Sequence, residues 1–203
     1  MIQIDKGLID RLTESESIVF FTGAGISSES GIPTFRGKDG IWNKLQNHFK
    51  DVSVITQNID NLHRRAGSKK IYELHGNIER HFCINCKKFY NEEPDFSKGV
   101  PKCECGGLIR PDVVWFGEYL PEDQFFGGEK AAITSDVFFV VGTSAVVYPA
   151  AGLVYTAKQS GSTIVEINIE ETPLTSIADY SYFGKAGEIL PVIFEELKLR
   201  TNA

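Results

Sequence analysis

Residues 22–27 read Thr-Gly-Ala-Gly-Ile-Ser and follow an apolar run, Ile-Val-Phe-Phe, at residues 18–21. A strand that turns through glycines into a helix start exposes backbone N–H groups to an anionic ligand, usually a nucleotide diphosphate. Glycine is expected in such a turn because a Cβ would keep the backbone away from the phosphate. The stretch therefore predicts a nucleotide site at the end of a strand.

The sequence after this turn differs from that of an ordinary dehydrogenase. The usual dinucleotide motif is G-x-G-x-x-G, and Ser28 occupies its third glycine position. A dehydrogenase would continue as a long helix and a second strand that ends in an acidic residue. Residues 31–37 instead read Gly-Ile-Pro-Thr-Phe-Arg-Gly, which is a loop sequence. We expect the nucleotide to lie under an irregular loop, and the chemistry to be other than plain hydride transfer.

Composition restricts the class of protein. The chain has 203 residues, of which 42% are hydrophobic and 24% charged, as in a globular protein of one domain or one domain with a small insert. The net charge of -6 argues against direct nucleic-acid binding. No apolar run reaches the roughly 18 residues of a membrane span, and the first residues do not resemble a secretory leader. These features predict a cytoplasmic protein without a membrane partner.

Four β-rich runs alternate with segments of helical character. The runs are residues 18–21, 52–56, 137–141 and 163–169, and helices are expected at residues 7–15, 150–159 and 189–199. The run 137–141 is apolar without a break, as in a parallel strand that is covered on both faces. The alternation predicts an α/β fold with a doubly wound parallel sheet.

All four cysteines lie in a stretch that is too short and too polar to be held together by burial alone. They form two pairs, Cys83 with Cys86 and Cys103 with Cys105, separated by sixteen residues. Such pairs can place four thiolates around one Zn²⁺, and four ligands leave no position for water, so we expect a structural metal. The alternatives are four unrelated reduced thiols or a redox pair, although no helix that could lower a thiol pKa obviously begins at Cys83.

Polar residues follow the predicted strands, at the edge of the sheet where ligands bind. Residues 56–63 read Thr-Gln-Asn-Ile-Asp-Asn-Leu-His, in which Gln57, Asn58 and Asp60 could hydrogen-bond a carboxamide or ribose hydroxyls. The alternative is a polar turn with Asp60 as the N-cap of a helix. The tripeptides 142–144 and 168–170 could contact phosphate, ribose or adenosine, although strand-end turns often contain such residues.

His75 is the histidine best placed for catalysis. The ordinary pKa of histidine, about 6.5, makes it the natural general base at neutral pH. His75 directly precedes the cysteine-rich insert, where a cleft between two subdomains is expected. A lone histidine is more often structural, and we interpret His48, His63 and His81 as structural residues.

Taken together, these segments resemble the sirtuin family of NAD-dependent protein lysine deacylases. The resemblance is carried by GAGIS and SGIPTFRG within residues 23–37, TQNIDNLH at 56–63, LHG at 74–76, the two cysteine pairs, RPDVVWFGE at 110–118, GTS at 142–144, Asn168, and KAGE at 185–188. It covers nearly the whole chain in the order of the family.

The resemblance implies two domains. Residues 1–36, 52–78 and 110–203 would form a Rossmann-type NAD-binding domain, and residues 79–109 a small zinc-binding domain inserted in it. Residues 37–51 would be a shortened cofactor-loop and helical segment of the small domain. NAD, as a co-substrate, and an acyl-lysine protein or peptide would bind in the cleft between the domains.

The roles of family residues carry over to the matching positions. His75 is the implied general base, and the four cysteines are the implied zinc ligands. The implied NAD-binding residues are Gly23, Ala24, Gly25, Ser27, Thr34, Phe35, Arg36, Trp42, Gln57, Asn58, Ile59, Asp60, Gly142, Thr143, Ser144, Asn168, Ile169, Glu170 and Ala186. The implied substrate-binding residues are Val113, Val114, Trp115 and Phe116, which would offer a strand edge to an extended peptide.

The reaction that the resemblance implies consumes NAD without reducing it. The acyl carbonyl oxygen attacks the ribose carbon as nicotinamide leaves. His75 then deprotonates a ribose hydroxyl, which attacks the imidate that has formed. Water enters later, and the products are free lysine and O-acyl-ADP-ribose. The alternatives are mono-ADP-ribosyl transfer at the same NAD site and a non-catalytic zinc-ribbon adaptor.

Two departures from the family concern the acyl group. Thr34 stands where many sirtuins have Asp, which is similar to the class III members that favour succinyl and malonyl lysine, so we expect removal of these groups beside acetyl. Those members also have a Tyr-x-x-Arg element whose arginine pairs with the acyl carboxylate. That element belongs after Trp42, where this chain is several dozen residues shorter than the family.

Overall fold

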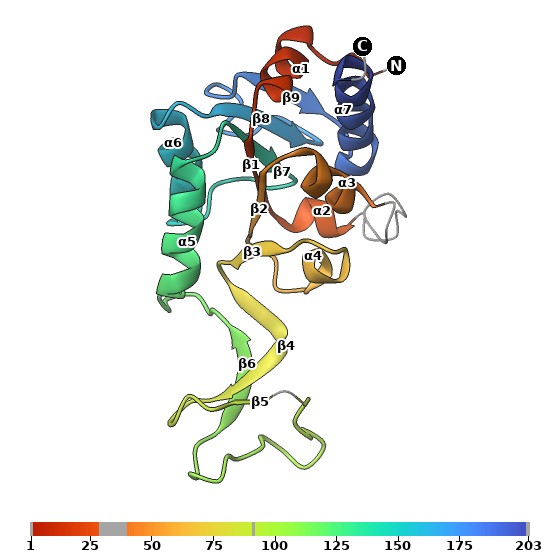
Figure 1. The fold of residues 1–203 in the computed structure, drawn as a ribbon. Coiled ribbons are helices and arrows are strands. Elements are labelled where there is room, and N and C mark those ends of the chain that lie inside the picture. Colours follow the sequence, from red (N-terminus) through yellow and green to blue (C-terminus); the bar gives the residue numbers. More distant parts are fainter. Residues whose placement is uncertain (1, 29–39, 91, 202–203) are drawn as a thin grey trace.

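The computed structural model describes residues 2–28, 40–90 and 92–201, which form two units joined by two strands (Figure 1). The larger unit is a parallel sheet between two layers of helices, and the smaller unit is an antiparallel sheet whose strands and loops carry the four cysteines. Among the described residues, no helix has the length and apolar character that crossing a membrane requires.

The sheet of the larger unit has six parallel strands. They are β1 (Ser17–Thr22), β2 (Asp51–Thr56), β3 (Lys70–Glu73), β7 (Val137–Val141), β8 (Thr163–Asn168) and β9 (Tyr180–Phe183). Their order is β3-β2-β1-β7-β8-β9, and every neighbouring pair is parallel. From β1 the chain adds β2 and β3 on one side of the sheet and then β7, β8 and β9 on the other side. This is the strand order of a Rossmann fold. The predicted doubly wound sheet is confirmed, with β3 and β9 as strands that the sequence pattern did not reveal.

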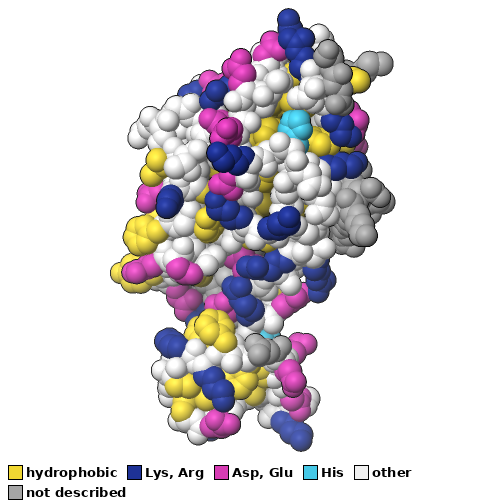
Figure 2. Space-filling model, viewed as in Figure 1, with side chains coloured by type: hydrophobic (Ala, Val, Ile, Leu, Met, Phe, Trp, Pro, Cys, Tyr) yellow, Lys and Arg dark blue, Asp and Glu magenta, His cyan; other side chains and the backbone are white. Residues whose placement is uncertain are grey.

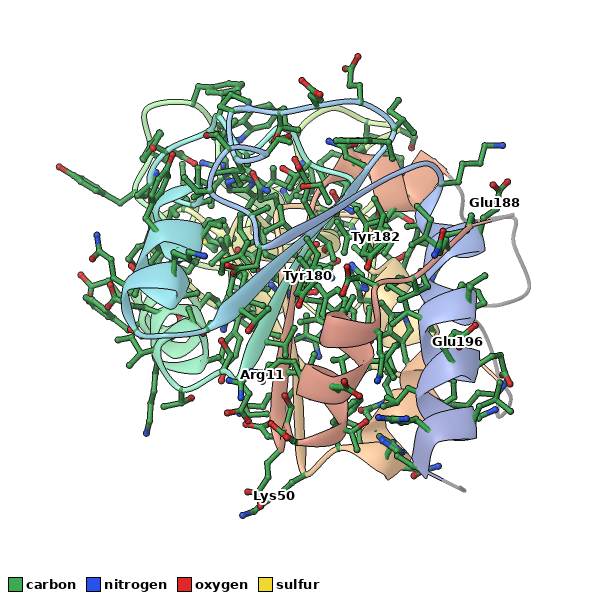
Figure 3. The ribbon with its side chains drawn as sticks, turned by 90° about the horizontal axis from the view of Figure 1, so that it is seen from above. Arg11, Lys50, Tyr180, Tyr182, Glu188 and Glu196 are labelled. Atoms are coloured by element: carbon green, nitrogen blue, oxygen red, sulfur yellow. The ribbon has the colours of Figure 1, made fainter. Side chains whose placement is uncertain are left out.

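Helices cover both faces of this sheet. One face is covered by α1 (Lys6–Thr13), α3 (Ile41–His48) and α7 (Ala186–Thr201), and the other by α5 (Glu122–Ile133) and α6 (Gly152–Gln159). Figure 3 looks down on this arrangement, with α1 and α7 separated by the sheet from α5 and α6. Two short helices, α2 (Ala24–Ser28) and α4 (Leu62–Arg65), follow β1 and β2. The expected helices at 7–15, 150–159 and 189–199 correspond to α1, α6 and α7, whereas α5 was not predicted.

The edge strand β9 is fixed by the first turn of α1. The backbone N–H of Asp5, the N-cap of α1, donates a hydrogen bond of 3.1 Å to the hydroxyl of Tyr182. Tyr180, on the same face of β9, packs against the core, and its hydroxyl lies close to the backbone of Gly7 (Figure 3). These contacts cover one face of a strand that would otherwise expose its aromatic side chains.

Aromatic residues fill the core on both sides of the sheet. Phe20 stacks on Phe139 with ring centroids 4.8 Å apart and meets the edge of Trp42 at 4.9 Å. Phe21, the next residue, points to the opposite face and stacks on Phe138. This alternation explains why β7 is apolar at every position and β1 is apolar at its four central positions, since each of their faces is covered by helices.

The segment expected to belong to the small domain packs elsewhere. We expected residues 37–51 in the small domain and Trp42 beside the cofactor. The described part of this segment forms α3, which packs against α7 and β2, and Trp42 is 1% exposed in the core. The physical reason is that Trp42 and Leu45 of this two-turn helix form one apolar side together with Phe49, which directly follows it, and the open face of the parallel sheet buries all three.

The smaller unit is held by little apolar burial. Its sheet has the order β5-β4-β6, with β4 (Gly76–Cys83), β5 (Phe89–Tyr90) and β6 (Ile109–Val113) antiparallel. The buried residues of its hydrophobic cluster are Cys83, Cys103 and Ile109. Figure 2 shows the unit as a separate lobe with hydrophobic side chains on its surface. A lobe of this kind needs a further link to be stable, as the sequence predicts.

Truncation of Phe20 should destabilise the larger unit strongly. Phe20 is fully buried and contacts two aromatic rings, so Phe20→Ala should lower the free energy of unfolding by about 3–5 kcal/mol. Chemical denaturation followed by fluorescence measures this change. The control is Phe126→Ala, whose side chain is 60% exposed and should cost less than about 1 kcal/mol. Equal losses in both variants would contradict this account of the core.

Candidate functional site

Two adjoining cavities lie at the carboxyl edge of the parallel sheet. The first has a volume of about 480 Å³ and lies between the turns that follow β1, β2, β7 and β8. The second has a volume of about 640 Å³ and lies between the loop after β2, His75 and the end of β6. Ala24, Gln57 and Asn58 line both cavities, so one elongated ligand could occupy the two together.

Most of the predicted site residues line these cavities. In the first cavity are Gly23, Ala24, Gly25, Gln57, Asn58, Gly142, Thr143, Ser144, Asn168, Ile169 and Glu170. The second cavity adds Ser27, Ile59, Asp60, His75, Val113, Val114, Trp115 and Phe116.

Two of the predicted cofactor residues lie elsewhere, and three fall outside the described residues. Trp42 is in the hydrophobic core, and Ala186 is buried at the start of α7, outside both cavity linings. Thr34, Phe35 and Arg36 lie outside the described residues.

The glycines of the first turn are needed for contact with a second turn. A Cβ at Gly23 would lie 2.6 Å from the Cβ of Thr143, and a Cβ at Gly25 would lie 2.7 Å from the Cα of Gly142. Gly142 itself has φ +58°, and the N–H of Gly25 donates a hydrogen bond of 2.8 Å to its carbonyl. The turns after β1 and β7 therefore touch through their backbones, which gives these glycines a packing role beside any role toward a ligand.

The loop after β2 is tied to both turns by its amide side chains. Asn58 donates hydrogen bonds to the carbonyl of Gly23, at 2.9 Å, and to the hydroxyl of Ser27, at 2.8 Å. Gln57 donates to the hydroxyl of Thr143 at 2.9 Å. Asp60 accepts from the hydroxyl of Ser27 and from the N–H of Leu62. The N-cap of α4 is Asn61, not Asp60 as the capping alternative expects, although the carboxylate of Asp60 does hold the first N–H of the helix and also takes part in the polar network of the cavity.

His75 is held in one orientation by the backbone. Its Nδ1 lies 2.9 Å from the carbonyl oxygen of Gln57. Because a carbonyl can only accept, Nδ1 carries the hydrogen, and Nε2 is the basic nitrogen of the neutral ring. The ring borders the second cavity, so a general base is available there.

His63 is a buried structural histidine. Its Nε2 lies 2.9 Å from the hydroxyl of Thr22, which in turn donates to the hydroxyl of Thr56. Desolvation by burial lowers the pKa of His63 to about 4, against the opposing effects of the nearby carboxylates Asp60 and Glu73. The ring is therefore neutral at pH 7, in agreement with the sequence interpretation.

The wall of the second cavity after β6 is fixed by an ion pair. Arg110 donates to both carboxylate oxygens of Glu118, at 2.5 and 3.0 Å, and Glu118 accepts from the N–H of Trp115 at 2.9 Å. The hydrogen bonds from Arg110 and from the backbone of Trp115 hold the pKa of Glu118 at about 2. Phe116 and Gly117, which lie between Trp115 and Glu118, are exposed along the cavity rim.

Sequence reasoning missed several lining residues of the second cavity. They are Gly117, Glu118, Leu120, Val147, Tyr148 and Pro149. Glu118 ends the segment RPDVVWFGE at residues 110–118, but the sequence alone indicates no role for it. Residues 146–149 could have been suspected from their run of apolar residues directly after the turn at 142–144, because apolar residues that leave a sheet edge often line a pocket.

The four cysteines form one metal-binding cluster. Their sulfur atoms all lie within 4.8 Å of one another, with Cys83 and Cys105 3.4 Å apart and Cys86 and Cys103 3.6 Å apart. Four sulfurs around Zn²⁺ at about 2.3 Å would be roughly 3.8 Å apart, so the cluster fits one tetrahedral zinc ion. Gly107 makes this possible, because a Cβ there would lie 2.6 Å from the sulfur of Cys83.

These features define a class of protein. A Rossmann-ordered sheet, a glycine turn at its topological switch point and a neighbouring cavity with an oriented histidine indicate a nucleotide-binding α/β protein with a cysteine-ligated metal lobe. The family model described as Sir2 family matches residues 23–51 and 43–149. The chain belongs to the Sir2 family.

Curated relatives and solved structures agree with this assignment. A protein of Pyrococcus furiosus named NAD-dependent protein deacylase is 44% identical over 238 aligned positions, which cover 92% of this chain and 95% of the relative. A protein of Aquifex aeolicus with the same name is 42% identical, covering 91% and 97%. A mutant Sir2 homologue in complex with ADP-ribose has a TM-score of 0.86 at 38% identity, covering 98% of each chain. The structure described as Sir2-p53 peptide-NAD+ has a TM-score of 0.84 at 37% identity, covering 97% and 100%.

The alignment lengths locate a gap in this chain. The alignment with the Pyrococcus furiosus protein has 238 positions, whereas 92% of 203 residues is about 187, so about fifty positions of the relative have no counterpart here. The family model matches in two pieces that overlap at residues 43–51, which puts the gap beside α3. These lengths agree with the expectation of a shortened segment after Trp42.

Loss of one cysteine should remove the metal. Cys103→Ser replaces a thiolate ligand, so the zinc content of protein purified under reducing conditions should fall from about one ion per chain to well below one. Metal analysis of the purified protein measures this. Glu104→Gln is the control, because Glu104 is exposed between two ligands and should leave the metal bound. Wild-type protein without zinc would contradict the assignment.

Neutral His63 should make folding sensitive to acid. Its pKa in the folded state, about 4, is below the ordinary value of 6.5, so the unfolded chain takes up a proton first as the pH falls. The free energy of unfolding should therefore decrease between about pH 6.5 and pH 4, by up to about 3 kcal/mol, and this contribution is fully present above pH 6.5. Denaturant unfolding across this range, compared between wild type and His63→Gln, measures it. Identical slopes in the two proteins would show that His63 is not the group responsible.

Proposed function

We propose that this protein is an NAD-dependent protein lysine deacylase that releases nicotinamide and O-acyl-ADP-ribose. The observation that carries the proposal is the position of His75. Its ring is oriented by Gln57 and borders a cavity that shares its lining with the glycine-turn cavity. The relatives at about 40% identity named NAD-dependent protein deacylase support the same function.

Each cavity suits a different part of the ligands. The first cavity, with its glycine turns and with Asn168 and Glu170 at the end of β8, suits the ADP-ribose part of NAD. The second cavity suits the nicotinamide end together with the acylated lysine. Bound NAD supplies a ribose carbon from which nicotinamide can leave. His75 accepts a proton from a ribose hydroxyl through Nε2, while Nδ1 stays bonded to the carbonyl of Gln57.

The end of β6 suits an extended peptide. Residues 113–116 line the second cavity, and Phe116 is fully exposed. The N–H of Val114 already donates to the carbonyl of His75 at 3.0 Å, so this segment and the general base move together. We infer that the peptide adds to this segment as a further strand, the mode known as β-augmentation. The related structure described as Sir2-p53 peptide-NAD+ supports a peptide as the substrate.

The described lining of the second cavity favours an uncharged acyl group. Succinyl and malonyl groups carry a carboxylate that needs a cation. Among the described residues, the lining of the second cavity contains the carboxylates of Asp60 and Glu118 but no lysine or arginine. The expectation of succinyl and malonyl removal therefore has no support from the described lining, and we expect acetyl to be removed faster.

Product mass tests the proposed function. The protein is incubated with NAD and matched acetyl, succinyl and malonyl peptides, and products are identified by mass spectrometry. We expect free lysine peptide, nicotinamide and O-acetyl-ADP-ribose, with acetyl peptide consumed faster than the other two because its acyl group carries no charge. ADP-ribosylated protein would instead indicate ADP-ribosyl transfer, and the absence of any NAD-dependent product would favour the adaptor.

His75→Ala provides the matched variant in the same assay. Removal of a general base should lower product formation by about 100-fold or more, while NAD binding measured by calorimetry changes little. Full turnover by His75→Ala would contradict the assignment of the base.

A further inference from the structure

The residues on either side of His75 are tied together by a buried carboxylate. Glu73 ends β3, and Asn77 lies at the start of β4, so each is two residues from His75 in sequence. The side-chain amide of Asn77 donates a hydrogen bond of 2.8 Å to Glu73 Oε1. Both residues are almost inaccessible, at 3% and 2% exposed. The five-residue turn that presents His75 is therefore closed at its base by this hydrogen bond.

Two arginines complete the surroundings of the carboxylate. Arg64 of α4 donates to both oxygens of Glu73, at 3.2 and 3.1 Å. Arg80 of β4 donates to Oε2 at 2.6 Å and also donates to Asp112 of β6 at 2.9 Å. We name this set, Glu73 with Arg64, Asn77, Arg80 and Asp112, the Glu73 joint. It connects β3 and α4 of the larger unit to β4 and β6 of the small sheet.

The joint keeps its central carboxylate charged. Desolvation by burial raises the pKa of Glu73, but the hydrogen bonds from Arg64 and Asn77 and the charges of both arginines outweigh it, so the pKa lies below its ordinary value. A buried carboxylate that stays ionised depends on each of its partners, because removal of one leaves its charge less well compensated. The joint therefore resists small displacements of either sheet.

The position of the small sheet and the position of His75 are coupled. Gly76, directly after His75, has φ +78°, and a Cβ at this residue would lie 2.0 Å from the carbonyl oxygen of Asp112. The carbonyl of His75 accepts from the N–H of Val114, also on the β6 side. A shift of β6 relative to β3 would consequently move the backbone of His75.

We propose that the Glu73 joint is a positioning device that fixes the His75 imidazole for its proton transfer. Glu73 lies in neither cavity lining, so it acts through the turn and not on a ligand. This inference rests on the proposed function, because it concerns the step in which His75 accepts a proton. In that reaction nicotinamide leaves before His75 acts, so the two steps can be measured separately.

Glu73→Gln tests the joint, because it keeps the shape of the side chain and removes its charge. Product formation should fall by about tenfold to a hundredfold, which is the cost of a small misplacement of a catalytic group. Exchange of labelled nicotinamide into NAD in the presence of acetyl peptide reports the earlier step. That exchange and the KM for NAD should both change by less than about threefold, since neither depends on His75.

Two comparisons separate positioning from loss of folding. Glu16→Gln makes the same chemical change in an exposed ion pair with Lys50, at the amino end of β1, and should leave both rates unchanged. Arg80→Lys keeps a cation beside Glu73 and should retain more product formation than Arg80→Gln. Thermal unfolding of each variant confirms that the protein compared is folded.

The outcomes distinguish the two proposals. If nicotinamide exchange and product formation fall equally in Glu73→Gln, the joint has only a structural role and the inference is overturned. The inference is also overturned if neither rate changes in this variant. A wild-type protein that forms no product would contradict the proposed function, and with it the inference. If the wild-type protein forms product and Glu73→Gln forms it at the same rate, only the inference about the Glu73 joint is contradicted.

Discussion

The backbone contact between the turns after β1 and β7 is the constraint on which the site depends. Gly25 and Gly142 approach so closely that neither could carry a side chain, and this contact lies where the strand order of the sheet reverses. The loop after β2 is then tied to both turns through Gln57 and Asn58. Gln57 in turn orients His75. One close approach of two turns thus determines where both cavities lie and how they meet.

The parts of the fold that could be predicted are those whose residues are buried on every side. The strands β1 and β7 are apolar at nearly all positions because helices cover both faces, and this pattern is visible in the sequence. The edge strands β3 and β9 read Lys-Ile-Tyr-Glu and Tyr-Ser-Tyr-Phe, which are short and half polar. The helix α5 contains Gly127 and Gly128, which weaken its helical pattern. Its backbone passes so close to the ring of Tyr72 that a Cβ at Gly127 would lie 2.3 Å from that ring.

The site could be predicted where a motif is continuous in sequence, and less well where partners come from distant segments. The glycine turn, the loop after β2, His75 and the cysteine pairs are all local patterns. The burial of Trp42 depends on α3 meeting the sheet, and the role of Glu118 depends on Arg110. The Glu73 joint unites residues from α4, β3, β4 and β6, and none of its members is unusual in its own segment.

The burial of the Glu73 joint also limits how this part of the chain can evolve. Substitution of Arg80 leaves the buried carboxylate of Glu73 with Arg64 as its remaining charged partner, and substitution of Glu73 removes the carboxylate that Arg64 and Arg80 share. Single substitutions at these positions are therefore expected to cost stability, and a replacement at one position is expected to be accompanied by a compensating replacement at another. The exposed ion pairs, such as Lys50 with Glu16, face no such restriction and can be exchanged singly. Substitutions in the turn that presents His75 should therefore arise together with substitutions in the strands that meet it.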